Sequence, residues 1–149
     1  MITHRYIENG DYEMLEKSLA VDEYHQGTTI DFFKEEGTST SIYFFDDEPI
    51  LFVRGKPFWN GNAAAIQLDI QFLNNASKAK NMIVMLKGFY ELEQNARSEG
   101  FSAFIFNSTV PLLRKFCTRR LGFSEWDENI LVKVLEQVPI DNGPGEVIE

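Results

Sequence analysis

The fold of this chain is decided by residues 80–106, which read KNMIVMLKGFYELEQNARSEGFSAFIF. From about Lys80 to Glu99, apolar side chains recur at three- and four-residue steps, the spacing of one face of an amphipathic helix: Met82, Met85, Leu86, Phe89, Leu92 and Ala96. Gly100 ends this pattern, since glycine commonly follows the last turn of a helix. Residues 101–106 are then almost wholly apolar, as expected of a central strand covered on both faces. The stretch therefore predicts a long helix followed directly by a buried strand.

The segment before this helix, Ala64–Leu73, alternates in polarity and predicts a long strand. Its apolar row alternates with a polar row: Ile66, Leu68, Ile70 and Phe72 against Gln67, Asp69 and Gln71. The polar row indicates a face that meets either a cleft or, more commonly, bulk water. Strand, helix and adjoining strand together predict a βαβ unit in which the two strands are parallel.

The first half of the chain predicts a strand, two helices and a β-hairpin. The strand segments are rich in β-branched and aromatic residues, and Asp or Thr stands where each helix would be capped. In chain order these are a strand at Ile2–Ile7, a helix from Asp11 to about Tyr24, a short helix from Thr28 or Thr29 to Gly37, and strands at Ser41–Phe45 and Pro49–Val53. The turn Asp46-Asp47-Glu48-Pro49 joins the last two strands, and Gly55–Asn62, with its Gly, Pro and Asn content, is predicted to be a loop.

The C-terminal part predicts one more helix and one more strand. Thr109 can cap the helix, Gly122 ends it, and Ile130–Leu135 supplies the strand. A chain of 149 residues suits one core, so we expect a single domain over residues 1–138 with a loose tail over 139–149. The expected class is α/β, with a mixed central sheet, an antiparallel meander plus a parallel pair, flanked by helices.

The charge of the chain is unevenly distributed. The net charge is −9, yet residues 78–120 carry eight basic and three acidic side chains, a local excess of five positive charges. This excess indicates either a locally held small polyanion or simply solvated basic helix faces. The acidic total argues against extended nucleic-acid binding.

The cysteine and histidine content of the chain indicates in which cellular compartment the protein is expected. Cys117 is the only cysteine, and neither His4 nor His25 stands at a metal-ligand spacing from it, so we expect no disulfide and no metal site. The first ten residues lack the apolar core of a secretory signal, and no apolar run approaches the roughly 20 residues that span a bilayer. A cytoplasmic protein without a membrane partner is the expectation.

Three short motifs stand in order in the second half of the chain. Ala96-Arg97-Ser98-Glu99-Gly100-Phe101 leads into Phe104-Ile105-Phe106-Asn107, and Arg120-Leu121-Gly122-Phe123 closes the next helix. With the order of predicted elements over about residues 2–136, they resemble the GNAT superfamily of N-acetyltransferases. The resemblance implies the GNAT acyl-CoA N-acyltransferase fold and acetyl-CoA as cofactor.

The resemblance also places the cofactor site. Counting back from Gly100, the family's pyrophosphate motif falls on Lys80-Asn81-Met82-Ile83-Val84-Met85. The family usually has small residues there, because bare backbone lets helix N-terminal amides approach the diphosphate, whereas Ile83 and Met85 are bulky. If the helix begins earlier, a small and polar cradle is the alternative, with Lys78 and Lys80 beside it: Asn75, Ala76, Ser77 and Ala79. Asn107 and Phe116 are the remaining implied cofactor contacts.

For catalysis, the resemblance implies direct attack of an amine on the thioester. Asp69, the only carboxylate on the long strand, is the expected base, and a structural carboxylate is the alternative. Backbone N–H groups near Phe72 and Leu73 are expected to polarise the carbonyl where two strands diverge. Many members of the family have a Tyr that can protonate the departing thiolate, and that position is Thr118 in this chain. The reaction can proceed without this proton donor, because a thiol with a pKa of about 8.5 leaves readily as its anion. Cys117 is predicted to be a core residue rather than a nucleophile.

The leading hypothesis is therefore an acetyl-CoA-dependent N-acetyltransferase acting on a small-molecule or protein amine. A GNAT-fold binding or structural module that has lost catalysis is the alternative, indicated by Ile83, Met85 and Thr118. An acidic mimic of nucleic acid ranks below both. Phe58 and Trp59 either line a substrate mouth or pack at a hairpin end or a dimer contact, so a homodimer stays open.

Overall fold

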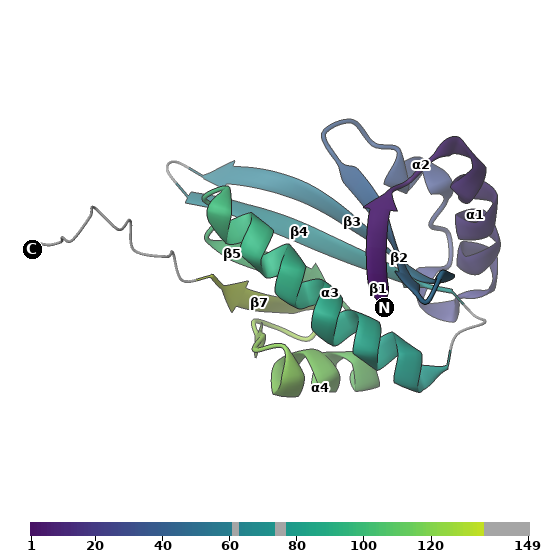
Figure 1. Ribbon diagram of the computed structural model, residues 1–149. Coiled ribbons are helices and arrows are strands. Elements are labelled where there is room, and N and C mark those ends of the chain that lie inside the picture. Colours follow the sequence, from purple (N-terminus) through teal and green to yellow (C-terminus); the bar gives the residue numbers. More distant parts are fainter. Residues whose placement is uncertain (61–62, 74–76, 136–149) are drawn as a thin grey trace, which may run out of the picture.

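Seven strands of the described residues form one mixed sheet, in the order β1-β2-β3-β4-β5-β7-β6. The computed structural model describes residues 1–60, 63–73 and 77–135 (Figure 1). The β4–β5 pair is parallel and the other neighbouring pairs are antiparallel, which confirms the predicted α/β class. The strands are β1 (Ile2–Tyr6), β2 (Ser39–Phe45), β3 (Glu48–Asn60), β4 (Ala63–Phe72), β5 (Ala103–Asn107), β6 (Ser124–Glu125) and β7 (Ile130–Val134).

Helices cover both faces of the sheet. α3 (Lys78–Ser98) crosses one face, and α4 (Pro111–Arg120) lies beside it (Figure 1). α1 (Tyr12–Val21) and the single-turn α2 (Ile30–Phe33) pack on the opposite face. Short 3₁₀ turns, Asn9–Asp11 and Glu23–His25, flank α1, so the helix predicted to reach Tyr24 ends at Val21. No helix among the described residues is long and apolar enough to cross a membrane.

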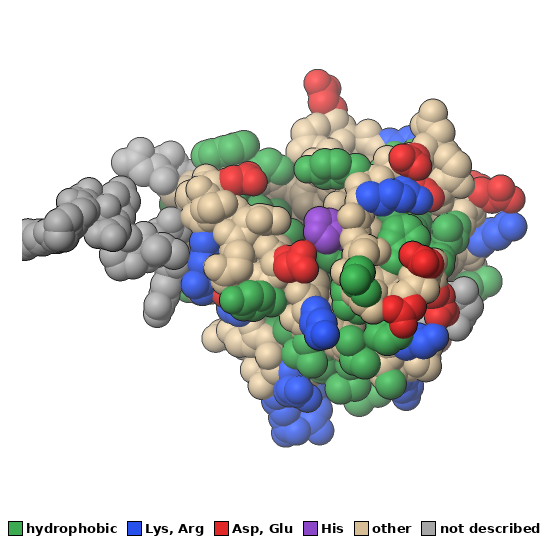
Figure 2. All heavy atoms as spheres, in the orientation of Figure 1, with side chains coloured by type: hydrophobic (Ala, Val, Ile, Leu, Met, Phe, Trp, Pro, Cys, Tyr) green, Lys and Arg blue, Asp and Glu red, His purple; other side chains and the backbone are tan. Residues whose placement is uncertain are grey.

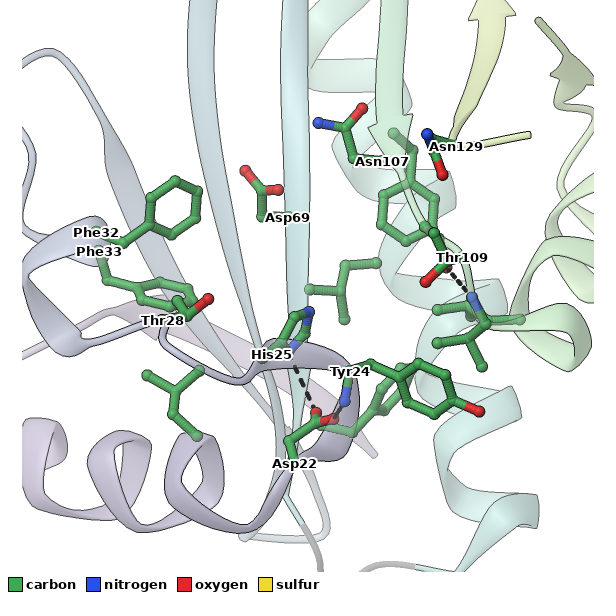
Figure 3. A pocket seen from close by; sticks show the side chains of 17 residues that line it. Asp22, Tyr24, His25, Thr28, Phe32, Phe33, Asp69, Asn107, Thr109 and Asn129 are labelled. Carbon is green, nitrogen blue, oxygen red and sulfur yellow. Dashed lines mark hydrogen bonds and ion pairs between the residues drawn. The ribbon is translucent and has the colours of Figure 1, made fainter. Parts of the chain in front are cut away.

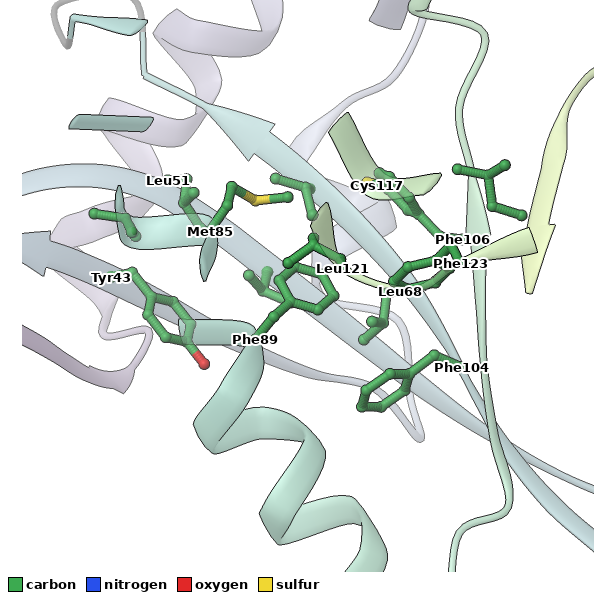
Figure 4. Close-up of a cluster of buried hydrophobic side chains, with 14 of the residues drawn as sticks. Tyr43, Leu51, Leu68, Met85, Phe89, Phe104, Phe106, Cys117, Leu121 and Phe123 are labelled. Atoms are coloured by element: carbon green, nitrogen blue, oxygen red, sulfur yellow. The ribbon is translucent and has the colours of Figure 1, made fainter. Parts of the chain in front are cut away.

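Two hydrophobic clusters hold the layers together, and strand alternation assigns residues to one or the other. On β3, Phe52 points to the α1 side, whereas Leu51 and Val53 point to the α3 side. The larger cluster lies between the sheet and α3 with α4 (Figure 4) and includes Leu68, Met85, Phe89, Phe104, Phe106, Cys117, Leu121 and Phe123. The smaller cluster joins α1 and α2 to β2 and β3 through Leu15, Leu19, Phe33, Ile42, Phe52 and Leu73.

The predicted βαβ unit is confirmed, with β4, α3 and β5 as its three parts. Pairing of the parallel strands runs from Ala65 opposite Ala103 to Leu68 opposite Phe106 and then stops. β4 continues to Phe72 and stays paired with β3 over that length. The two parallel strands therefore diverge after Leu68, and beyond that residue no strand in the described part of the chain lies beside this backbone edge of β4.

The first hairpin is also confirmed, but the loop predicted at Gly55–Asn62 is wrong. Asp46 and Asp47 both have positive φ and form a two-residue turn between β2 and β3. β3 then continues to Asn60 and pairs with β4 along its length. Pro57 is tolerated because β2 pairs only as far as Gly55, so the missing N–H faces an edge without a partner strand.

The start of α3 differs from the main prediction. The helix begins at Lys78 instead of Lys80, and the hydroxyl of Ser77 caps it by accepting a hydrogen bond from the Lys80 amide at 3.2 Å. Ser or Thr before a helix is a strong cap signal, and the apolar periodicity alone could not locate the first turn. The short strand β6 was not predicted, and the predicted tail over residues 139–149 lies outside the described residues.

Gly88, in the middle of α3, is explained by a close approach between helix and sheet. A Cβ atom there would lie 2.9 Å from Cε2 of Tyr43, on β2. The Tyr43 ring stacks on His4 of β1, with ring centroids 4.9 Å apart. Glycine therefore lets the helix lie directly against a ring that its other neighbours hold in place.

We predict that Gly88→Ala destabilises the protein. Alanine gains about 1 kcal/mol of helix propensity, but overpacking a fixed contact costs about 1–3 kcal/mol, so the net loss in the free energy of unfolding should reach up to about 2 kcal/mol. Chemical denaturation measures the difference. Lys87→Ala, at the exposed neighbouring position, should change stability by less than about 0.5 kcal/mol. A more stable Gly88→Ala protein would show that the Tyr43 ring is not fixed.

Candidate functional site

A cleft opens where β4 and β5 diverge, and we call it the β4–β5 cleft. Its volume is about 390 Å³, within the range of small-molecule sites. Its walls come from β4, from the connection between α1 and α2, and from the loop that follows β5 (Figure 3). Its polar lining residues are Asp22, Tyr24, His25, Thr28, Asp69, Asn107, Ser108, Thr109 and Asn129.

Asp69 lies on the cleft side of β4, as its position in the polar row predicts. Its carboxylate accepts a hydrogen bond from the guanidinium of Arg54 at 3.0 Å, and its side chain is only 18% exposed. Burial raises the pKa of Asp69 above its usual value, although Arg54 and His25 act in the opposite direction. The polar row is therefore not a solvated face at this point.

Arg54 is the residue that organises this side of the cleft. It is 1% exposed on β3 and donates to Asp69, to the Glu35 carboxylate and, through Nε, to the Phe32 carbonyl oxygen at 2.8 Å. The Phe32 ring also covers the guanidinium, whose carbon lies 3.7 Å from the ring centroid. Arg54 therefore ties α2 to the sheet, while Lys56 completes the pairing of Glu35 at 3.1 Å.

A second polar cluster lies on the opposite side of Asp69 and contains His25, Asp22 and Gln71. The Nδ1 atom of His25 lies 3.2 Å from the Asp22 carboxylate and also contacts the Oε1 atom of Gln71. Gln71 is fully buried, and its amide donates to Asp22 at 3.1 Å. The imidazole is thus held from one edge and lines the cleft (Figure 3).

Sequence reasoning missed both Arg54 and His25 as site residues. Arg54 stands inside an apolar strand, where a basic residue is a detectable anomaly. His25 stands three residues after Asp22, just beyond a helix end, and this pair was the only local signal. Among the described residues, no three His, Cys, Asp or Glu side chains lie close enough together to hold a metal ion.

The backbone amides of Phe72 and Leu73, which were both expected to polarise the thioester carbonyl, point to opposite edges of β4. The Leu73 amide donates to the Ile50 carbonyl on β3 at 2.9 Å, so it is not free for a ligand, contrary to the expectation. Successive amides of a strand point to opposite sides, so the Phe72 amide faces the edge that β5 has left. Phe72 also lines the cleft.

The residues of the motif expected at the start of α3 do not form one surface. Val84 and Met85 are buried in the core, so their side chains cannot line a cofactor site. Met82 and Ile83 are exposed, and the amide of Asn81 donates to the Ser77 carbonyl. The Lys80 ammonium pairs with Glu48 of the hairpin at 2.6 Å.

The earlier start of α3 favours the alternative cradle instead. Lys78 and Ala79 occupy the first helical turn, where amides have no partner within the helix, and both side chains are exposed. Lys78 adds a positive charge at the positive end of the helix dipole. Asn75 and Ala76, the first two residues of that cradle, lie outside the described residues.

The remaining predicted residues divide between the cleft and the core. Asn107 lines the cleft at the end of β5, whereas Phe116 is partly buried against the larger core cluster. Cys117 is fully buried, and burial raises the pKa of its thiol to about 12, so it is a core residue as expected. Trp59 lies 69% exposed near the far end of β3, so it does not line the β4–β5 cleft.

Comparison with known proteins gives matches in three dimensions only. No protein-family model matches the sequence, and no curated protein sequence matches it. A probable acetyltransferase from Staphylococcus epidermidis matches with a TM-score of 0.67 at 16% identity, over 91% of this chain and 100% of that one. A GNAT-family acetyltransferase from Staphylococcus aureus Mu50 matches with a TM-score of 0.67 at 10% identity, over the same shares. The chain has the GNAT fold.

A third GNAT-like match is the aminoglycoside acetyltransferase AAC(6′)-Ib in complex with coenzyme A and kanamycin. It has a TM-score of 0.65 at 15% identity, over 90% of this chain and 95% of that one. At such identities the likeness establishes the fold, and the chemistry of the cleft must carry any argument about the reaction.

We predict that replacing Asp69 by Asn changes the pH dependence of stability. Because the folded-state pKa of Asp69 is raised, the folded protein binds more protons than the unfolded chain between the ordinary and the raised value. The stability of the wild type relative to Asp69→Asn should therefore be highest at acid pH and fall as pH rises through that range. Urea denaturation at several pH values measures it, with the exposed Asp31→Asn as the control for loss of one charge. A relative stability that rises with pH would show a lowered pKa instead.

Proposed function

We propose that the protein is an acetyl-CoA-dependent N-acetyltransferase whose acceptor is a cationic amine. One observation carries the proposal: the cleft between β4 and β5 brings together a buried carboxylate, an oriented imidazole and the open-edge amide of Phe72. These are the groups that proton removal and carbonyl polarisation require. The GNAT fold is consistent with this reaction, but a fold by itself does not establish a reaction.

The cofactor would lie between the open edge of β4 and the first turn of α3. The exposed amides of Lys78 and Ala79, together with the Lys78 ammonium, suit the phosphate groups of acetyl-CoA. Ala79 brings a small side chain, so the backbone can approach a phosphate there. Acetyl-CoA would supply the acetyl group as an activated thioester.

The residues of the cleft suit direct transfer of the acetyl group from the thioester to the nitrogen of the acceptor amine. Asp69 accepts a proton from the acceptor ammonium, and its raised pKa makes it a stronger base than an exposed carboxylate. The free amine then forms the nitrogen–carbon bond while the carbon–sulfur bond breaks, and the nitrogen releases its second proton to solvent as the amide forms. The Phe72 amide stabilises the charge that develops on the carbonyl oxygen. Thr118 donates its hydroxyl to the Lys115 carbonyl, so the thiolate departs as an anion without protonation by that side chain.

His25 is the second candidate for the base. Asp22 lies against its Nδ1 atom, an arrangement that orients the imidazole. Asp69 is already engaged by Arg54, which lowers its basicity, whereas the other ring nitrogen of His25 has no contact with Asp22. The two residues therefore make different predictions about which substitution abolishes the reaction.

The acceptor proposed here is a small molecule with an ammonium group. Asp22 and Asp69 line the cleft and the chain carries a net charge of −9, so the field favours a cation. AAC(6′)-Ib, with the same fold, binds the aminoglycoside kanamycin, which is consistent with an amine in this cleft. The competing function is a GNAT-fold binding module without catalysis, which the Arg54–Asp69 ion pair and the presence of Thr118 favour.

We predict that acetyl-CoA binds and that Lys78→Glu weakens it. Reversing one charge beside the phosphates should raise Kd about tenfold in low salt, with a smaller effect at high salt. Calorimetric titration measures both constants. Lys87→Glu makes the same charge change further along α3 and should leave Kd within about twofold. Absence of heat with either acetyl-CoA or coenzyme A would reject the proposed cofactor.

We predict that Asp69→Asn lowers turnover at least tenfold near neutral pH, because a positioned base typically contributes about 10²–10⁴ in rate. The loss should shrink at high pH, where the acceptor amine is already free. Release of coenzyme A thiol with a panel of polyamines and aminoglycosides is the assay. His25→Gln is the matched variant: if it alone abolishes turnover while Asp69→Asn reacts at the wild-type rate across pH, His25 is the base. Binding of acetyl-CoA without thiol release for any amine would favour the binding module.

A further inference from the structure

A second cavity lies on the other face of the sheet, between β1 and the C-terminal half of α3. Its volume is about 550 Å³, and we call it the β1–α3 trough. Its floor and helix wall are apolar and include Val53, Ile66, Leu68, Leu92 and Ala96. Figure 2, viewed from this side, shows a histidine in a recess between the regions of β1 and α3. No described residue lines both this trough and the β4–β5 cleft.

Tyr43 is the most buried of the polar side chains that line this trough. The residue is 4% exposed, and the described residues offer its hydroxyl no hydrogen-bond partner. The hydroxyl oxygen itself is not fully buried, so it reaches the trough and can donate a hydrogen bond to a bound molecule there.

The position of Tyr43 is fixed from two sides. His4 stacks on one face of the ring with the centroids 4.9 Å apart, and Gly88 of α3 leaves room for the ring edge at a place where any Cβ would clash. Glycine in a helix interior costs about 1 kcal/mol relative to alanine, so the chain accepts a weaker helix to keep this ring in place. The hydroxyl is thus preorganised, which lowers the entropic cost of binding.

The electrostatics of the trough favour an uncharged ligand. Burial, with Glu91 nearby, raises the pKa of Tyr43 to about 12, so the hydroxyl stays a neutral donor over the physiological range. Glu99 lines the rim, and Glu91 lies 3.4 Å from His4. Arg5 also lines the trough, but its guanidinium is already paired with the Asp11 carboxylate at 2.6 Å. An anionic molecule would therefore meet the two glutamate carboxylates and no unpaired guanidinium, whereas a hydrogen-bond acceptor without charge would meet the Tyr43 donor.

We propose that the β1–α3 trough binds a small uncharged aromatic molecule, with its ring on the apolar floor and an acceptor oxygen at the Tyr43 hydroxyl. The trough is a slot between a sheet and a helix, and the rings of Tyr43, Pro57 and Phe101 line it, so a flat molecule fits it best. The site is separate from the proposed acetyl-CoA site, and its occupancy does not depend on catalysis.

A pair of probes tests this on the ¹⁵N-labelled full chain by nuclear magnetic resonance titration. 2-Acetylnaphthalene carries an acceptor oxygen, and 2-ethylnaphthalene has nearly the same shape without one. Both should shift the amide signals of Val53, Leu92 and Ala96, and the ketone should bind about three- to tenfold more tightly. Tyr43→Phe should remove this difference, while Tyr90→Phe, which changes an exposed tyrosine on α3, should keep it.

Two further measurements complete the test. Leu92→Trp, which fills the trough from the helix side, should weaken both probes at least tenfold, and saturating acetyl-CoA should leave both affinities unchanged. Circular dichroism verifies that each variant is folded. The proposal is overturned if neither probe shifts the trough signals up to its solubility limit, if the two probes bind the wild type equally, or if acetyl-CoA displaces them.

Discussion

Backbone pairing between β4 and β5 stops after Leu68 and Phe106, and the cleft exists because of this divergence. β4 cannot end there, since β3 continues to pair with it as far as Phe72. The open edge exposes amides that a sheet would otherwise satisfy, so this part of the backbone favours a polar ligand. The same divergence leaves the polar row of β4 facing a confined space instead of bulk water, and confinement changes what its side chains can do.

The charges beside the cleft are held by their neighbours. A guanidinium as buried as that of Arg54 is tolerated only when it is paired and hydrogen-bonded, and it contacts two carboxylates, a carbonyl oxygen and an aromatic face. Because these contacts come from α2, β4 and the segment after α2, Arg54 couples the acceptor side of the cleft to the sheet. Asp69 is consequently both a structural partner and a candidate base, and the balance between burial and ion pairing decides its proton affinity.

The two faces of the sheet have separate chemistry. The α1 side carries the ion pairs and hydrogen bonds around Asp69 and Gln71. The α3 side is mainly apolar, and its polar groups are the Tyr43 hydroxyl, the rim of the trough and surface ion pairs such as those of Glu93 with Arg97 and Lys133. Strand alternation enforces this separation, since neighbouring residues such as Ile42 and Tyr43 must point to opposite faces. A ligand on one face therefore need not disturb a reaction on the other.

The sequence by itself determined the features that depend on local pattern. Alternation identified β4 and its polar row with Asp69, three- and four-residue periodicity identified α3, and the acidic turn identified the β2–β3 hairpin, because neighbours along the chain largely set these. It could not place the first turn of α3, which depends on the Ser77 cap. Nor could it find Arg54 and His25, because Arg54 pairs with Asp69, 15 residues away in the chain, and His25 contacts Gln71, 46 residues away. Only the tertiary structure decided which side chains meet, because burial and pairing are properties of the packed chain and not of any one segment.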